Sequence, residues 1–113
     1  MRYRRLLLPM MIMAACSDPN PGSLRVRLLA ELSATEAAPR PQELLQLASH
    51  DVIADELCAI AADDSAPPLA RTRAIYSLRA FPTPASRTLL SRLVVTGATE
   101  YARALAARSL AAQ

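Results

Sequence analysis

The chain has 113 residues, which is enough for one small domain with a single hydrophobic core. Its apolar residues are mostly Ala and Leu, with one Phe, three Tyr, no Trp and only two Gly, and this composition predicts an all-α fold and excludes a Gly-rich nucleotide loop. The formal net charge is +3, but three Arg lie in the first five residues, and the part from residue 16 onwards has ten Arg and ten acids. The positive charge therefore gives no support for nucleic-acid binding.

Residues 1–15 are predicted to form a signal peptide. Arg2, Arg4 and Arg5 make a positively charged start, and an apolar run at 6–13 follows. This run is too short for a membrane-spanning helix, which needs roughly 20 apolar residues. Two alanines then precede Cys16.

The sequence Met13-Ala14-Ala15-Cys16 resembles the lipobox of bacterial lipoproteins, with Met13 where that family usually has Leu. The resemblance implies that Cys16 is lipidated, with fatty acyl chains such as palmitate, and becomes the first residue of the mature protein. Each buried acyl CH₂ contributes about 0.8 kcal/mol of membrane affinity. By resemblance to Gram-negative lipoproteins, Ser17 directly after the cysteine, where Asp would signal retention at the inner membrane, implies sorting to the periplasmic side of the outer membrane. The alternative is that Cys16 is an ordinary residue after a plain signal-peptidase site.

Residues 16–23 are predicted to be the lipidated Cys and a short linker, since Pro, Gly, Asp and Asn favour irregular structure. Periodic Leu and Ala residues then predict six helices. These helices span approximately 24–34, 42–49, 52–62, 68–80, 84–95 and 100–112.

The ends of these helices carry capping signals. The expected N-caps are Ser23, Asp51, Thr83 and Thr99 for the first, third, fifth and sixth helices, and the acids and Ser of 63–65 for the fourth. Proline is expected at the first position of the second and fifth helices, at Pro41 and Pro84. Gly97 is expected to end the fifth helix in a left-handed conformation.

A short pattern occurs twice in the C-terminal half. Arg71, Ala74 and Leu78 recur 32 residues later as Arg103, Ala106 and Leu110. A fixed period of this size is typical of stacked helical hairpins.

This R-x-x-A-x-x-x-L pattern resembles the second helix of the HEAT repeats found in bacteria, and a degenerate copy occurs at Arg40/Glu43/Leu47. The resemblance implies a short α-solenoid of about three antiparallel helical hairpins over 24–113. The alternative architecture is a plain antiparallel helical bundle.

The repeat arginines are interpreted as structural residues. In the HEAT-like family this Arg bonds an acid or a carbonyl in an adjacent turn, and Asp63 and Asp64 are the expected partners of Arg71. The acids are concentrated in 31–64 and the arginines in 69–113, so these two blocks are expected to attract each other.

Residues with catalytic or metal-binding potential are few. His50 is the only His and is expected to end the second helix, where a positive charge suits the helix dipole. Cys58 is expected to be a small buried hydrophobic residue. The acids Asp51, Asp55 and Glu56 lack the spacing of a calcium loop and are interpreted as a solvated face. We therefore expect no enzyme activity, no metal and no cofactor.

One predicted face carries residues that are enriched at binding hot spots. It consists of Arg73, Tyr76, Arg79, Tyr101 and Arg108, on the sides of two helices that face away from the core. The alternative is that these arginines merely keep an Ala-rich surface soluble.

The resulting prediction is a non-catalytic, lipid-anchored module of the bacterial envelope that binds an unknown protein partner. The alternatives are a structural lipoprotein that self-associates and a subunit of a HEAT-like enzyme of the lyase type.

Overall fold

The computed structural model describes residues 21–34 and 36–113, and the predicted signal peptide, Cys16 and residues 17–20 of the predicted linker lie outside the described residues. The described part is helical and contains no strand, so the all-α prediction is confirmed. The helices are α2 (Pro21–Leu32), α3 (Pro41–Leu45), α4 (His50–Ala62), α5 (Pro68–Ser77) with the following 3-10 turn η1 (Leu78–Ala80), α6 (Pro84–Thr96) and α7 (Glu100–Ala112).

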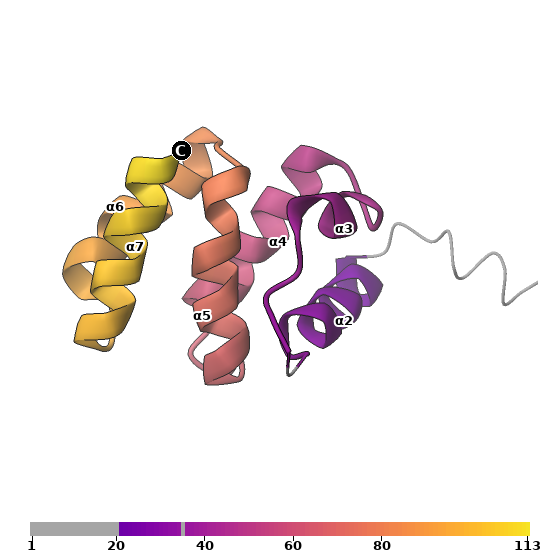
Figure 1. Ribbon diagram of the computed structural model, residues 1–113, viewed down its shortest axis with the longest axis horizontal. Coiled ribbons are helices and arrows are strands. Elements are labelled where there is room, and N and C mark those ends of the chain that lie inside the picture. The colour runs from indigo at the N-terminus through magenta and orange to yellow at the C-terminus, as the bar shows by residue number, and fades with distance from the viewer. Residues whose placement is uncertain (1–20, 35) are drawn as a thin grey trace, which may run out of the picture.

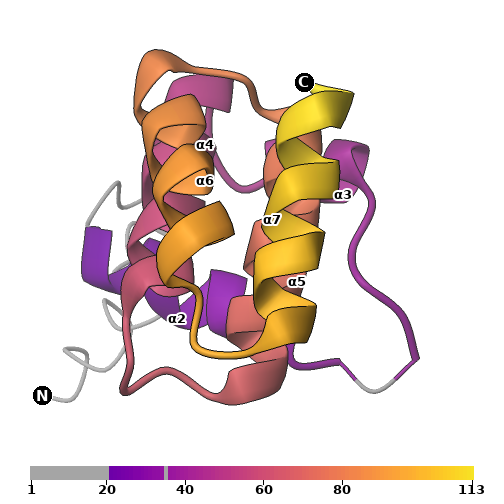
Figure 2. The same ribbon diagram turned by 90° about the vertical axis from the view of Figure 1, so that its left-hand side faces the viewer.

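The last four helices form two neighbouring hairpins. Helix α4 packs against α5, and α6 packs against α7. The hairpins also contact each other in register, because α4 touches α6 and α5 touches α7. Figure 2 shows the resulting two layers, with α4 and α6 in one layer and α5 and α7 in the other. The two helices that carry the 32-residue repeat, α5 and α7, thus lie side by side.

The first two helices are arranged differently from the prediction. Helix α2 packs across both α4 and α5, while α3 contacts α4. Helix α3 has five residues instead of the predicted eight, and Leu44 is its only buried side chain. A helix this short has too little apolar surface to pair with α2, so α2 finds its partners in the next hairpin.

One core runs through the molecule. It is filled by fully buried side chains from α2, α3, α4, η1, α6 and the chain between η1 and α6, among them Leu28, Leu32, Leu44, Ile53, Leu57, Ile60, Leu78, Phe81 and Leu90. The repeat residues belong to this core, since Ala74, Leu78 and Ala106 have no exposed surface and Leu110 packs against them. The Ala and Leu positions of the repeated pattern therefore belong to the core, as the sequence predicts.

Two of the predicted N-caps are confirmed. The Thr83 hydroxyl accepts a hydrogen bond from the N–H of Ser86, and the Thr99 hydroxyl accepts one from the N–H of Ala102. Pro84 and Pro41 each occupy the first turn of a helix, as predicted. Proline suits this position because the missing N–H would have no partner there.

Three other helix starts differ from the prediction. Helix α2 begins at Pro21, within the predicted linker, so Ser23 lies inside the helix and does not cap it. Helix α4 begins at His50 with Ser49 as N-cap, which places Asp51 in its first turn. Helix α5 begins after Pro67, and no side chain caps it. Asp63 does not cap α5, because its carboxylate accepts hydrogen bonds from the N–H and the hydroxyl of Ser65 and so closes the turn before the helix.

Gly97 does not adopt the predicted left-handed conformation. Its φ is −54° and its ψ is 144°, in a region open to any residue. Glycine is needed for a steric reason, because a Cβ at this position would lie 2.8 Å from the Leu93 carbonyl oxygen and 2.9 Å from Cγ of Arg103. Gly97 therefore allows the turn after α6 to pass close to α7.

Candidate functional site

The outer surface of α5 and α7 carries a hollow of about 410 Å³ lined mainly by apolar and aromatic side chains. We call its lining residues Leu69, Arg73, Tyr76, Tyr101 and Leu105 the tyrosine face; Thr72 and the α2–α3 connection at Ala37 and Ala38 complete the wall. Leu69, Tyr76 and Tyr101 are 44%, 44% and 60% exposed. Large side chains this exposed, gathered around one hollow, are typical of protein-binding surfaces.

Arg73 builds the wall of this hollow. Its Nη1 donates hydrogen bonds to the carbonyl oxygens of Leu32, at 3.2 Å, and of Ala34. These carbonyls follow the last turn of α2, so the guanidinium fastens the α2–α3 connection to α5. The sequence predicts Arg73 as a residue that contacts the partner, whereas in the structure its donor is used within the fold.

Arg79 supports the ring of Tyr76. The guanidinium carbon lies 4.0 Å from the ring centroid, and Nε donates to the Tyr76 carbonyl at 3.1 Å. Nη2 donates to Ser109 Oγ at 3.4 Å, which links η1 to α7. A cation–π contact and two hydrogen bonds hold Arg79 beside Tyr76, outside the lining of the hollow.

The five predicted binding residues are therefore divided by the structure. Arg73, Tyr76 and Tyr101 line one hollow, Arg79 lies behind Tyr76, and Arg108 is exposed outside the lining. Sequence reasoning missed Leu105 because it fits the buried apolar stripe of its helix. It missed Leu69 because a single apolar residue beside the stripe carries no signal of its own. It also missed the α2–α3 connection, whose position depends on the bonds of Arg73 to main-chain carbonyls.

The repeat arginines have unequal surroundings. Nη1 of Arg103 donates to the Gly97 carbonyl at 2.8 Å, as expected of an Arg that bonds a carbonyl in an adjacent turn. Nη1 of Arg71 lies 3.8 Å from Asp64, whose carboxylate is fully exposed. Nε of Arg71 is shielded from solvent and has no hydrogen-bond partner in the described part of the chain.

The predicted attraction between the acidic and basic blocks is largely absent. Asp63 pairs with Arg25 of α2, at 3.4 Å, and Glu56 pairs with the same guanidinium at 3.1 Å. Of the ion pairs between described residues, the long contact of Arg71 with Asp64 alone joins the two blocks. Hydrogen bonds from the Ser65 side chain and backbone lower the pKa of Asp63, with a smaller effect of Arg25. The acids thus hold α2 against α4.

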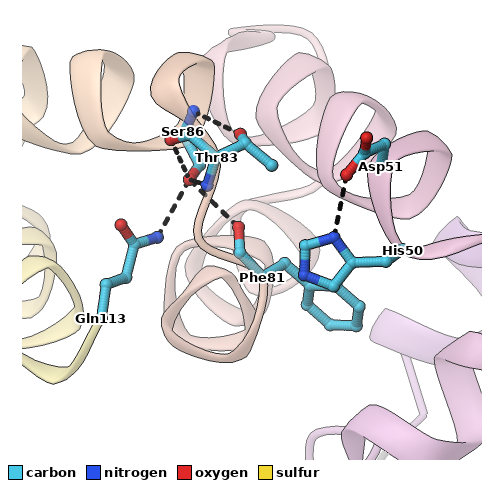
Figure 3. Close-up of polar contacts among 6 residues, drawn as sticks. All are labelled: His50, Asp51, Phe81, Thr83, Ser86 and Gln113. Atoms are coloured by element: carbon cyan, nitrogen blue, oxygen red, sulfur yellow. Dashed lines mark hydrogen bonds and ion pairs between the residues drawn. The ribbon is translucent and has the colours of Figure 1, made fainter.

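A cluster of buried polar groups lies between η1 and α6, at the end of α7 (Figure 3). Ser86 is fully buried, and the carbonyls of Phe81 and Thr83, at 3.1 and 3.0 Å, share the single proton that its Oγ donates. The same oxygen accepts from the Thr83 N–H at 2.9 Å. Gln113 Nε2 donates to the same oxygen at 3.0 Å and to the Leu78 carbonyl at 2.8 Å. Through the bonds of Gln113 to the Leu78 carbonyl and to Ser86 Oγ, this cluster fastens α7 to the chain around η1 and α6.

His50 and Cys58 show no arrangement for catalysis. His50 begins α4 and does not end the second helix as predicted. Its Nδ1 lies 3.0 Å from Asp51 Oδ1, and its ring packs against Phe81 at an angle of 43°, with centroids 5.2 Å apart (Figure 3). Burial, together with the nearby Asp55, raises the pKa of the half-buried Cys58 thiol to about 11. A thiol with this pKa is almost entirely protonated at neutral pH and is a poor nucleophile.

Among residues 21–34 and 36–113 no three His, Cys, Asp or Glu side chains are grouped as metal ligands. In the same ranges no helix combines the length and apolarity that crossing a bilayer requires.

Comparison with models of known families, with curated proteins and with solved structures gives no match in any of the three searches.

Proposed function

We propose that this chain is a lipid-anchored, non-catalytic protein-interaction module of the bacterial cell envelope, with a HEAT-like helical domain. The observation that carries the proposal is the tyrosine face, where Tyr76 and Tyr101 from neighbouring helices border one hollow of about 410 Å³. Tyrosine offers a large, rigid contact area with a polar end, which suits a surface that is exposed until a partner binds.

The HEAT-like part of the proposal is supported by the packing of the two C-terminal hairpins. First helix contacts first helix, α4 with α6, and second helix contacts second helix, α5 with α7. Stacked hairpins of a solenoid contact each other in this way. The two Arg-x-x-Ala-x-x-x-Leu patterns fall on the paired second helices α5 and α7, with the Leu of the first copy in η1.

The anchoring part rests on the sequence around Cys16, and fractionation of cells tests it. Full-length chain should sediment with membranes and incorporate a labelled fatty acid, while Cys16→Ala should lose both properties. Cys58→Ala is the matched control, because it removes the other thiol and should keep the label. A Cys16→Ala chain that still carries the label and sediments with membranes would contradict the anchor.

The binding part is tested by affinity capture of partners from solubilised membranes. Tyr76→Ser and Tyr101→Ser should each reduce recovery of the partner about tenfold, since truncating a hot-spot side chain costs more than 1 kcal/mol. Arg108→Gln is the matched control, because this exposed residue lies on α7 outside the hollow. Equal recovery by all three variants and the parent would show that the tyrosine face is not the binding surface.

A self-associating structural lipoprotein is the alternative. Sedimentation of the delipidated chain distinguishes it, because self-association predicts dimers or larger species while a partner-binding module predicts a monomer.

A further inference from the structure

A second hollow of about 440 Å³ lies between the two C-terminal hairpins, near their turns. In Figure 1 these turns, between α4 and α5 and between α6 and α7, lie at the lower side of the molecule. The hollow has an apolar wall that includes Ile75, Leu89 and Leu93. Its polar lining residues include Arg71, Arg92, Thr72, Thr96 and Thr99, of which Thr96 already donates its hydroxyl proton to the Arg92 carbonyl. Its volume falls within the range of small-molecule sites.

Arg71 is the group with unused bonding capacity. Its side chain is 26% exposed, and it donates no hydrogen bond to any residue that the structure describes. The shielded donor is Nε of Arg71, and leaving such a donor of a charged group without an acceptor is costly. Arg103, its equivalent one repeat later, has such an acceptor in the Gly97 carbonyl.

The charges around the hollow favour an anion. Among the residues that the structure describes, Asp64 is the only acid that lines it, and its carboxylate is fully exposed to solvent, 3.8 Å from Arg71. Arg92 is exposed and forms no ion pair with a described residue. The Thr99 hydroxyl accepts from the Ala102 N–H, which leaves its own proton available for donation.

We propose that this hollow binds the carboxylate of a small aliphatic acid, with Arg71 as the residue that holds the carboxylate and the Ile75, Leu89 and Leu93 wall as the contact for the aliphatic chain. A carboxylate presents two coplanar oxygens that match the fork of a guanidinium. A phosphate would bring additional negative charge against an apolar wall that has one half-buried cation. The proposed site shares only Thr72 with the wall of the hollow at the tyrosine face, and it does not depend on partner binding.

The test is a calorimetric titration of the full-length chain with hexanoate and, as a neutral probe of the same chain length, 1-hexanol. Hexanoate should bind saturably and at least about tenfold more tightly than 1-hexanol, because a hydrogen bond to a charged group contributes about 1.5–3 kcal/mol. Arg71→Gln should remove this difference. Arg87→Gln, at an exposed position of α6 outside the hollow, should leave it unchanged.

A second pair of probes distinguishes a free acid from the carboxyl end of a peptide. N-acetyl-leucine represents the peptide end, and N-acetyl-leucinamide is its neutral counterpart. Tighter binding of hexanoate identifies a free acid, while tighter binding of N-acetyl-leucine identifies a chain end, and both support a carboxylate site at Arg71.

Arg71→Lys covers the case in which Arg71→Gln does not fold. It keeps the charge but loses the forked geometry, so it should bind hexanoate more weakly than the parent. The proposal is overturned if neither acid binds saturably, if both neutral probes bind as tightly as the acids, or if the folded Arg71 variants bind like the parent. None of these results depends on Tyr76 or Tyr101. Failure of this proposal would therefore not contradict partner binding at the tyrosine face, which is tested separately.

Discussion

Residues at equivalent positions of the two repeats are alike where they are small and buried, and they differ at the repeat arginines. Ala74 and Ala106 are both fully buried, and so, within a few per cent, are Ser77 and Ser109. These positions could be predicted because helical periodicity alone decides which side of a helix faces the core. The partners of Arg71 and Arg103 could not, because they depend on the path of the neighbouring turn. Gly97 brings its carbonyl within reach of Arg103, whereas the turn before α5 offers Arg71 only a distant, solvated Asp64.

Ser86 provides a prediction at the scale of one residue. Ser86→Ala should lower the free energy of unfolding by about 1–3 kcal/mol, because it leaves the Thr83 N–H without its acceptor in a buried cluster and removes a bond to Gln113. Urea unfolding followed by circular dichroism measures the change. Ser91→Ala, at an exposed position of the same helix, should change the free energy by less than about 0.5 kcal/mol. Equal effects of the two substitutions would show that the Ser86 bonds contribute nothing.

At the scale of elements, the C-terminal helices follow their sequence signals closely. Thr83-Pro84 begins α6 and Thr99 begins α7, because a capping hydroxyl satisfies free N–H groups whatever the surroundings. The N-terminal helices follow their sequence signals less closely, because their capping signals are weak and packing against other helices decides where they begin and end. Helix α3 keeps one buried side chain, and α2 extends back to Pro21. The α2–α3 connection is held in place by hydrogen bonds from Arg73 to main-chain carbonyls distant in the sequence. Bonds of this kind leave no pattern in the sequence.

Arg73 therefore has a testable role in holding α2 and the connection against α5. Arg73→Gln should increase hydrogen exchange of the amides in 33–40, since the donor that binds the Leu32 and Ala34 carbonyls is lost. Amides in α6 should exchange as in the parent. Arg92→Gln is the matched control, as an exposed arginine remote from the connection. Unchanged exchange in 33–40 would contradict this role of Arg73.

At the scale of the whole molecule, two stacked hairpins carry two hollows with different chemistry. The tyrosine face lies on the outer surface of α5 and α7, and the hollow at Arg71 lies between the hairpins near their turns. The sequence indicates that Tyr76 and Tyr101 are near each other, because they share a helical face in neighbouring repeats. It does not indicate either hollow, because a hollow forms where side chains from separate elements fail to fill the space between them.

Site-specific photocrosslinking in cells tests the tyrosine face most directly. A benzophenone amino acid replaces Tyr101, which is 60% exposed and tolerates a larger ring, and in a matched chain it replaces Arg87 on the other layer of helices. The account predicts a discrete crosslinked species from position 101 that disappears when Tyr76→Ser is added, and none from position 87. Crosslinking from position 87 alone, or equally from both positions, would contradict the assignment of the tyrosine face as the surface that binds the partner.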